Sequence, residues 1–157
     1  MSRSNAAEYV SGLFGVAGKV AAVTGAGGPL CGAMALGLAR AGAKIVAMDV
    51  RPEKLERVEE EIRATGSECL SLGLDVLDKG QFENALASAT EAFGRVDILI
   101  NGSGINSPDP PLGIQAEDWD AIMNVNLRGT LFGCQVFGGH MVEQGGGSII
   151  NIASASS

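Results

Sequence analysis

Five short apolar runs, separated by stretches with helical periodicity, constrain the fold of this chain more than any other feature. The runs are rich in Val, Ile and Leu and cover residues 19–23, 44–48, 69–74, 96–100 and 148–152. Continuous apolar strands that alternate with helices are typical of a parallel sheet covered on both faces. The sequence therefore predicts an α/β fold with a doubly wound parallel sheet, for which the strand order would be 3-2-1-4-5.

The segments between the runs carry helix signals of their own. Pro52 stands in the first turn of a helix expected over residues 53–64, and Gly66 follows its end. An early proline and a terminal glycine are the usual asymmetry of a helix. Further helices are expected over residues 29–41, 79–93 and 116–142. In the last of these, Trp119, Ile122 and Leu127 are expected to supply apolar contacts, with Trp119 either in the core or at an interface.

Length, composition and charge exclude several classes of protein. A chain of 157 residues that is 46% hydrophobic suits one domain over residues 1–157, in which residues 1–17 form an amino-terminal extension. The 11 basic residues are scattered and outnumbered by 18 acidic ones, so no nucleic-acid partner is expected. Since no apolar run approaches the roughly 20 residues of a membrane span, we expect no membrane partner and a cytoplasmic location.

The cysteines and the single histidine give no sign of a metal centre or of hydrolase chemistry. Cys31, Cys69 and Cys134 stand far apart without a CxxC pair, so we interpret them as reduced, small apolar residues. His140 lies in a helical stretch, and the sequence contains no G-x-S-x-G around a nucleophile.

The first apolar run ends in a glycine-rich turn that precedes a helix. Residues 24–32 read T-G-A-G-G-P-L-C-G. Such a turn lets the backbone approach a pyrophosphate while amides and the helix dipole face its charge. We therefore expect Gly25, Gly27, Gly28 and Leu30 to contact a dinucleotide. Tight strand-to-helix turns also use glycine for steric reasons alone, so the turn by itself leaves both interpretations open.

An acidic residue at the end of the second run favours NAD as the cofactor. Asp49 follows Gly25 by about 24 residues, where a carboxylate can accept hydrogen bonds from both ribose hydroxyls and repel a ribose phosphate. Arg51 keeps NADP open as the less favoured cofactor, because a guanidinium could pair with that phosphate. Asp49 could alternatively just begin the turn toward Pro52.

Five motifs, taken in order, resemble those of one enzyme family. They are Thr24-Gly25 of a T-G-x-x-x-G-x-G turn, Asp75-Val76, Asn101-Gly102-Ser103-Gly104, Asn124-Val125-Asn126-Leu127 and Asn151-Ile152-Ala153-Ser154. Their order and spacing resemble the short-chain dehydrogenases/reductases, a family with the Rossmann fold, over nearly the whole chain.

The resemblance implies roles for particular residues. Asp75 and Val76 would contact the adenine, and the segment Asn101, Gly102 and Ser103 would line the cofactor site. Ser154 would contact the substrate oxygen, and Asn126 would belong to the catalytic group. The implied activity is hydride transfer between a nicotinamide cofactor and a small-molecule secondary alcohol or carbonyl compound, by a homodimer or homotetramer.

The chain also departs from the family pattern. Pro29 and Cys31 stand at the second and third glycine positions of the turn, and Cys31 places a side chain where glycine would allow the closest approach to a cofactor. Gly102 and Ser103 replace the asparagine and alanine of an N-N-A-G motif.

One family motif is absent from these residues. The family's Y-x-x-x-K pair follows the strand-end serine by about a dozen residues and performs the acid-base step. The single tyrosine here is Tyr9, so we expect a truncated Rossmann domain that is inactive by itself. The alternative is a non-catalytic dinucleotide-binding or regulatory module. Segments such as residues 104–108 and 134–138 look most like members that act on sugar acids, such as fructuronate reductase (mannonate oxidoreductase).

Overall fold

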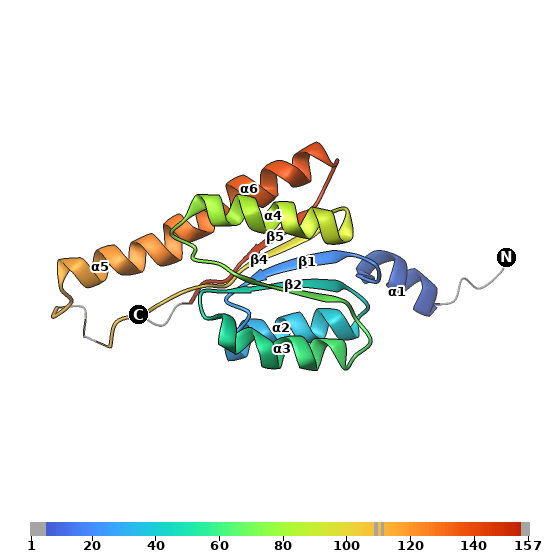
Figure 1. Cartoon of the computed structure of the whole chain (residues 1–157), viewed down its shortest axis with the longest axis horizontal. Coiled ribbons are helices and arrows are strands. Elements are labelled where there is room, and N and C mark those ends of the chain that lie inside the picture. The colour runs from blue at the N-terminus through green and yellow to red at the C-terminus, as the bar shows by residue number, and fades with distance from the viewer. Residues whose placement is uncertain (1–5, 109, 111, 155–157) are drawn as a thin grey trace.

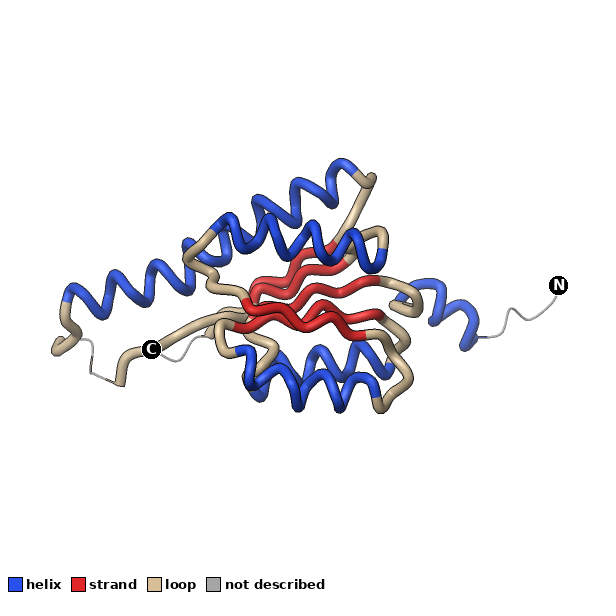
Figure 2. The backbone as a smooth tube through the Cα atoms, viewed as in Figure 1, coloured by secondary structure: helices blue, strands red, loops and turns tan. Residues whose placement is uncertain are grey.

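A five-stranded parallel sheet with helices on both faces forms the centre of the protein. The structure is a computed structural model that describes residues 6–108, 110 and 112–154. The strand order is β3-β2-β1-β4-β5, which confirms the predicted doubly wound fold. Figure 2 shows the strands running side by side between two layers of helices. The strands are β1 (Val20–Thr24), β2 (Lys44–Asp49), β3 (Cys69–Gly73), β4 (Ile98–Asn101) and β5 (Ser148–Asn151).

The helices divide between the two faces of the sheet (Figure 1). The helices α2 (Pro29–Arg40) and α3 (Leu55–Arg63) cover one face, and α4 (Lys79–Phe93) and α6 (Gly129–Glu143) cover the other. A 3₁₀ turn, η1 (Pro52–Lys54), leads into α3. On the first face Ala35, Val58 and Ile62 pack against the strands, while Phe82 and Phe137 do so on the second. Alternate strand residues enter each cluster, as expected for a sheet buried on both faces.

The helix expected over residues 116–142 is continuous but changes its geometry. It consists of α5 (Ala116–Met123), a π-helical segment η2 (Asn124–Arg128) and α6. Ile122 is half-buried, but Trp119 and Leu127 do not pack into the core, because these side chains are 54% and 61% exposed. The physical reason is visible in Figure 1, where α5 extends past the end of the sheet. The alternative place for Trp119, at an interface, stays a prediction.

The amino-terminal extension contains a helix that the sequence did not predict. The helix α1 (Ala6–Phe14) lies beyond the amino ends of the strands in Figure 1. Its side chains Tyr9, Val10, Leu13 and Phe14 are exposed. Among the described residues, no helix has both the length and the apolar character needed to cross a membrane.

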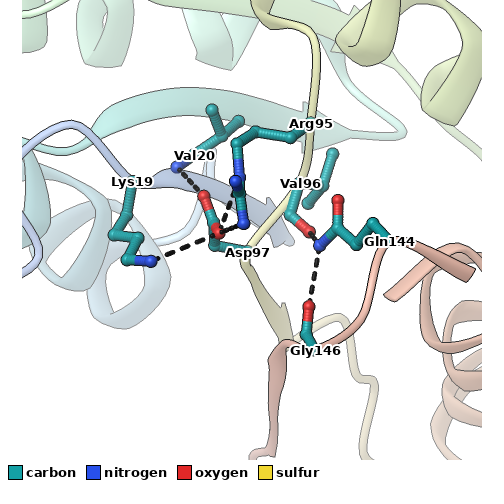
Figure 3. Close-up of polar contacts among 7 residues, drawn as sticks. All are labelled: Lys19, Val20, Arg95, Val96, Asp97, Gln144 and Gly146. Atoms are coloured by element: carbon teal, nitrogen blue, oxygen red, sulfur yellow. Dashed lines mark hydrogen bonds and ion pairs between the residues drawn. The ribbon is translucent and has the colours of Figure 1, made fainter. Parts of the chain in front are cut away.

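A buried carboxylate ties the amino ends of β1 and β4 together (Figure 3). Asp97 accepts a hydrogen bond from the amide of Val20 at 3.0 Å. It also accepts from Nε of Arg95 at 2.9 Å and pairs with Nζ of Lys19 at 3.6 Å. Burial raises the pKa of Asp97, but the Val20 amide and the two cations outweigh it and hold the pKa below its usual range.

We expect Asp97→Asn to lower the free energy of unfolding by about 1–3 kcal/mol at pH 7, since the amide loses the charge-assisted bonds. A depressed folded-state pKa gives stability that is complete above the unfolded pKa of about 3.9 and is lost as the pH falls through the folded pKa. The difference in the free energy of unfolding between the unaltered chain and the variant, measured in urea, should therefore be smaller at pH 3 than at pH 7. An equal gap at both pH values would contradict this assignment.

Candidate active site and cofactor cleft

The carboxyl ends of the strands surround a cleft of about 490 Å³. Parallel strands place their carboxyl ends at one edge, and a crevice opens where the strand order reverses beside β1. The lining residues are Gly25, Gly28, Asp49, Val50, Arg51, Leu74, Asp75, Val76, Gly102, Ser103, Gly104, Ile105 and Val125. The cleft thus brings together seven of the predicted cofactor residues, which are Gly25, Gly28, Asp49, Asp75, Val76, Gly102 and Ser103.

The glycine-rich turn forms one wall of this cleft. Gly25 adopts a φ of +70°, and a Cβ atom there would come within 2.9 Å of the Gly102 carbonyl oxygen. Glycine is therefore required on both conformational and steric grounds. Gly28 is the N-cap of α2 and has no side-chain cap. Two predicted contacts, Gly27 and Leu30, are absent from the lining, and Leu30 is 56% exposed.

Asp49 is buried at the end of β2 and holds the turn. Its Oδ2 accepts a hydrogen bond from the Gly27 amide at 3.1 Å, and its Oδ1 accepts from the Arg51 amide at 3.0 Å. Nε of Arg51 lies 3.6 Å from Oδ1. Each carboxylate oxygen has a second lone pair, so the group retains acceptor capacity toward the cleft. Gly27 therefore acts through Asp49 instead of lining the cleft itself.

The segment after β3 contributes Asp75 and Val76. Asp75 Oδ1 accepts from the Leu77 amide at 2.9 Å, while the Asp75 amide donates to Gln81 Oε1 at 2.7 Å. Val76 is 7% exposed, and a Cβ atom on Gly129 would come within 2.8 Å of its Cβ. The absence of a side chain at Gly129 thus lets the start of α6 approach the floor of the cleft.

Thr24 is a site residue that sequence reasoning missed. Its hydroxyl accepts hydrogen bonds from the amides of Gly102 at 3.0 Å and Ser103 at 3.2 Å. Thr24 is 1% exposed, so these bonds form away from water. They fix the loop after β4 against the end of β1 across a sequence separation of 78 residues. Its place in the T-G motif was the available signal, although the motif does not reveal the partner.

Asn101 points away from the cleft and toward β5. Its Nδ2 donates to Asn151 Oδ1 at 2.9 Å and to Cys134 Sγ at 3.6 Å. A side chain on Gly133 would overlap Asn101 Oδ1. The structure therefore gives Asn101 a part in joining β4 to β5 and α6, and its side chain is outside the cleft lining.

Asn126 lies in the π-helical segment and grips the loop after β4. Its Oδ1 accepts from the Ile105 amide and its Nδ2 donates to the Ile105 carbonyl, both at 2.9 Å. The segment closes with a bond from the Gly129 amide to the Asn124 carbonyl, and such π segments are frequent at functional sites. Asn126 thereby fixes Ile105, which lines the cleft.

Ser154 follows β5 at the carboxyl edge of the sheet. Asn151 pairs with Asn101, and the Ile152 amide donates to the Asn101 carbonyl at 2.9 Å. This pairing brings the strand end toward the same edge as the cleft, while Ser154 itself is exposed and absent from the cleft lining.

The departures at Pro29 and Cys31 leave the cleft open. Pro29 takes the first position of α2, where a missing amide costs no helical bond. Cys31 is 3% exposed and faces the Gly102 carbonyl at 3.7 Å, and it is absent from the cleft lining. The concern that its side chain would occupy the cofactor's approach is therefore not supported by the geometry.

Comparisons with known proteins agree with this architecture. The family model described as short chain dehydrogenase matches residues 19–157. D-threitol dehydrogenase of Mycolicibacterium smegmatis (strain ATCC 700084 / mc(2)155) is 36% identical over 141 residues, covering 90% of this chain and 54% of that protein. For 2-dehydro-3-deoxy-D-gluconate 5-dehydrogenase of Escherichia coli (strain K12), the identity is 40% over 142 residues, with 90% and 55% covered. The crystal structure of NAD⁺-bound xylitol dehydrogenase matches with a TM-score of 0.85 at 32% identity, over 88% of this chain and 54% of that one.

This chain belongs to the short-chain dehydrogenase family. It spans about half the length of the curated relatives that it matches. The similarity extends to dehydrogenases named for several substrates, so the narrower expectation of a likeness to fructuronate reductase stays a prediction.

We expect Thr24→Val to lower the free energy of unfolding by about 1–3 kcal/mol, because it leaves the amides of Gly102 and Ser103 without their acceptor. Thr24→Ser keeps the hydroxyl and is the matched control. Urea unfolding measures the loss, and amide hydrogen exchange should accelerate at residues 102 and 103 in the valine variant alone. Equal behaviour of the two variants would show that the hydroxyl is not what holds this loop.

Proposed function

We propose that this chain supplies the cofactor-binding half, and part of the active site, of a nicotinamide-dependent oxidoreductase. The observation that carries the proposal is the cleft, in which the glycine-rich turn, Asp49 and the loop after β4 face one space. Its volume of about 490 Å³ suits a cofactor site. The bound nicotinamide would exchange a hydride with the carbon of a secondary alcohol or ketone.

The residues of the cleft fit a dinucleotide. Gly25 and Gly28 leave room for close backbone approach, and the first turn of α2 has amides without a side-chain cap. Such amides and the helix dipole favour a pyrophosphate. Asp75 and Val76 also line the cleft, and the adenine would bind beside them.

Asp49 favours NAD over NADP in this proposal. The buried carboxylate at the end of β2 can accept ribose hydroxyls, and its negative charge repels a ribose phosphate. Nε of Arg51 lies 3.6 Å from the same carboxylate, so the guanidinium is already ion-paired with Asp49. The name of the xylitol dehydrogenase structure, which is NAD⁺-bound, supports the same choice.

We expect the chain to bind NADH more tightly than NADPH, and Asp49→Ser to narrow the ratio of the two dissociation constants by about tenfold, or 1.4 kcal/mol. Cofactor fluorescence titration gives both constants. Asp75→Ser is the matched control, because it removes a carboxylate from the same cleft on the adenine side and should leave the ratio unchanged. Equal affinities of the unaltered chain for the two cofactors would contradict the preference for NAD.

Ser154 and Asn126 take the catalytic roles in this proposal. Ser154 would hold the substrate oxygen, supported by its place after β5 at the edge that carries the cleft. Asn126 would support a water-mediated proton path, and its grip on Ile105 keeps the neighbouring loop in place. A polyol, sugar or sugar acid is the proposed substrate class, in line with the names D-threitol dehydrogenase and 2-dehydro-3-deoxy-D-gluconate 5-dehydrogenase.

We expect the 157-residue chain to bind NADH but to show no turnover of secondary alcohols. Positioned acid-base groups contribute roughly 10² to 10⁴-fold to the rate. The single tyrosine, Tyr9, lies on α1, which Figure 1 places beyond the amino ends of the strands. Spectrophotometry with NAD and a panel of polyols tests this, and measurable NADH formation would contradict it. A longer reading frame without a Y-x-x-x-K segment would instead favour a non-catalytic module.

The long helix presents an apolar stripe that we propose as a contact between copies. Trp119, Met123, Leu127 and Leu131 recur every four residues, and all are exposed, by 37% to 61%. Residues four apart lie on one face of a helix. An exposed apolar stripe of this kind is typical of an association surface.

We expect the unaltered chain to self-associate, and the double variant Leu127→Glu with Leu131→Glu to shift it toward monomer, because two charges would have to be buried in the contact. Ala121→Glu adds a charge at an exposed position of the same helix outside the stripe, two residues from both Trp119 and Met123, and serves as control. Light scattering measures the mass. A monodisperse monomer of the unaltered chain would argue against the proposed contact.

A further inference from the structure

Cys31 and Gly102 meet at the base of the cleft, although they are 71 residues apart in the sequence. Cys31 lies in the first turn of α2 and is 3% exposed. Its Sγ lies 3.7 Å from the carbonyl oxygen of Gly102, which lines the cleft. The contact therefore joins the glycine-rich turn to the loop after β4.

The thiol occupies the space that a side chain at residue 102 would need. A Cβ atom on Gly102 would overlap Cys31 Sγ, and it would lie 3.1 Å from the Thr24 carbonyl oxygen. Gly102 has no positive φ, so its backbone would accept alanine, and the closest obstacle to a side chain there is Cys31 Sγ, ahead of the Thr24 carbonyl. Both positions differ from the family motif in opposite directions, since Cys31 is larger than the usual glycine and Gly102 is smaller than the usual asparagine.

The chemistry of the thiol matches its position. Burial, and then the charge of Asp49, raise the pKa of Cys31, so the thiol stays protonated and can donate to the Gly102 carbonyl. The Gly102 amide donates to the Thr24 hydroxyl at 3.0 Å. Residue 102 is thus held at both its amide and its carbonyl, immediately before Ser103 in the cleft wall.

We propose that Cys31 is a positioning residue for the cofactor cleft, and that it forms a size-matched pair with Gly102. The thiol fills the space left by the absent side chain and fixes the carbonyl, so the cleft keeps its shape despite both departures from the motif. The consequence for the cofactor rests on the proposed function, whereas the packing of the pair does not.

A double-mutant cycle tests the pair without cofactor. Gly102→Ala should lower the urea midpoint of unfolding because its Cβ meets the thiol. Adding Cys31→Gly should restore at least half of that loss, although Cys31→Gly alone is destabilising. Gly104→Ala is the matched control, since its Cβ would face Asn126 Oδ1 at 3.3 Å, and Cys31→Gly should not rescue it. Additive losses in the Cys31/Gly102 cycle would overturn the proposal.

Cofactor affinity tests the positioning role under conditions in which every variant is folded. We expect Cys31→Ala, which removes the donor and most of the volume, to raise the NADH dissociation constant by about threefold to tenfold. Cys31→Ser keeps a donor and should stay within about twofold of the unaltered chain. Unchanged affinity in Cys31→Ala would overturn the positioning role. Failure of the unaltered chain to bind NADH would instead contradict the proposed function. The double-mutant cycle would still show whether Cys31 and Gly102 are matched in size.

Discussion

Burial of the central strands on both faces is the constraint on which the rest of the structure depends. Every residue of β1 is buried, and the clusters beside it contain Phe82 and Phe137 on one face and Ile45 and Ile62 on the other. The two phenylalanine rings meet edge to face, with centroids 6.5 Å apart. Because both faces are covered, polar chemistry is confined to the ends of the strands, where the chain leaves the sheet.

At the carboxyl edge of the sheet, polar side chains form hydrogen bonds to backbone groups. Thr24 accepts the amides of residues 102 and 103, Asp49 accepts the amides of Gly27 and Arg51, and Asn126 bonds both polar groups of Ile105. Turns that approach a ligand closely cannot satisfy these groups through sheet pairing, and a buried group without a partner is costly. The shape of the cleft therefore depends on hydrogen bonds between these side chains and the backbone, which form without a ligand.

At the amino edge of the sheet, side chains likewise bond to backbone groups, and here the contacts include ion pairs. Asp97 brings the Val20 amide, Arg95 and Lys19 together, and Gln144 donates to the carbonyls of Val96 and Gly146 (Figure 3). The β5 side of the sheet is less covered, with Ile149 and Ile150 exposed by 37% and 48%.

Most helices and strands could be predicted from local patterns in the sequence. Apolar runs and helical periods are local properties, so the five strands and the helices over residues 29–41, 53–64 and 79–93 could be read without coordinates. The order of the strands follows only once the fold is taken to be doubly wound. The sequence also placed Asp49 and the glycine-rich turn at the edge where the cleft opens, because a parallel sheet brings its strand ends together.

Which side chains contact one another could not be predicted from local patterns. Asn101 donates to Asn151, and the Gly27 amide donates to Asp49. Cys31 contacts the Gly102 carbonyl, and the Gly102 amide donates to the Thr24 hydroxyl across 78 positions of the sequence. Trp119 looked like a packing residue by its spacing, yet α5 extends past the sheet that could have covered it. The physical reason is common to all of them: a local pattern specifies the period of an element, whereas a contact between distant segments depends on where the whole fold brings them.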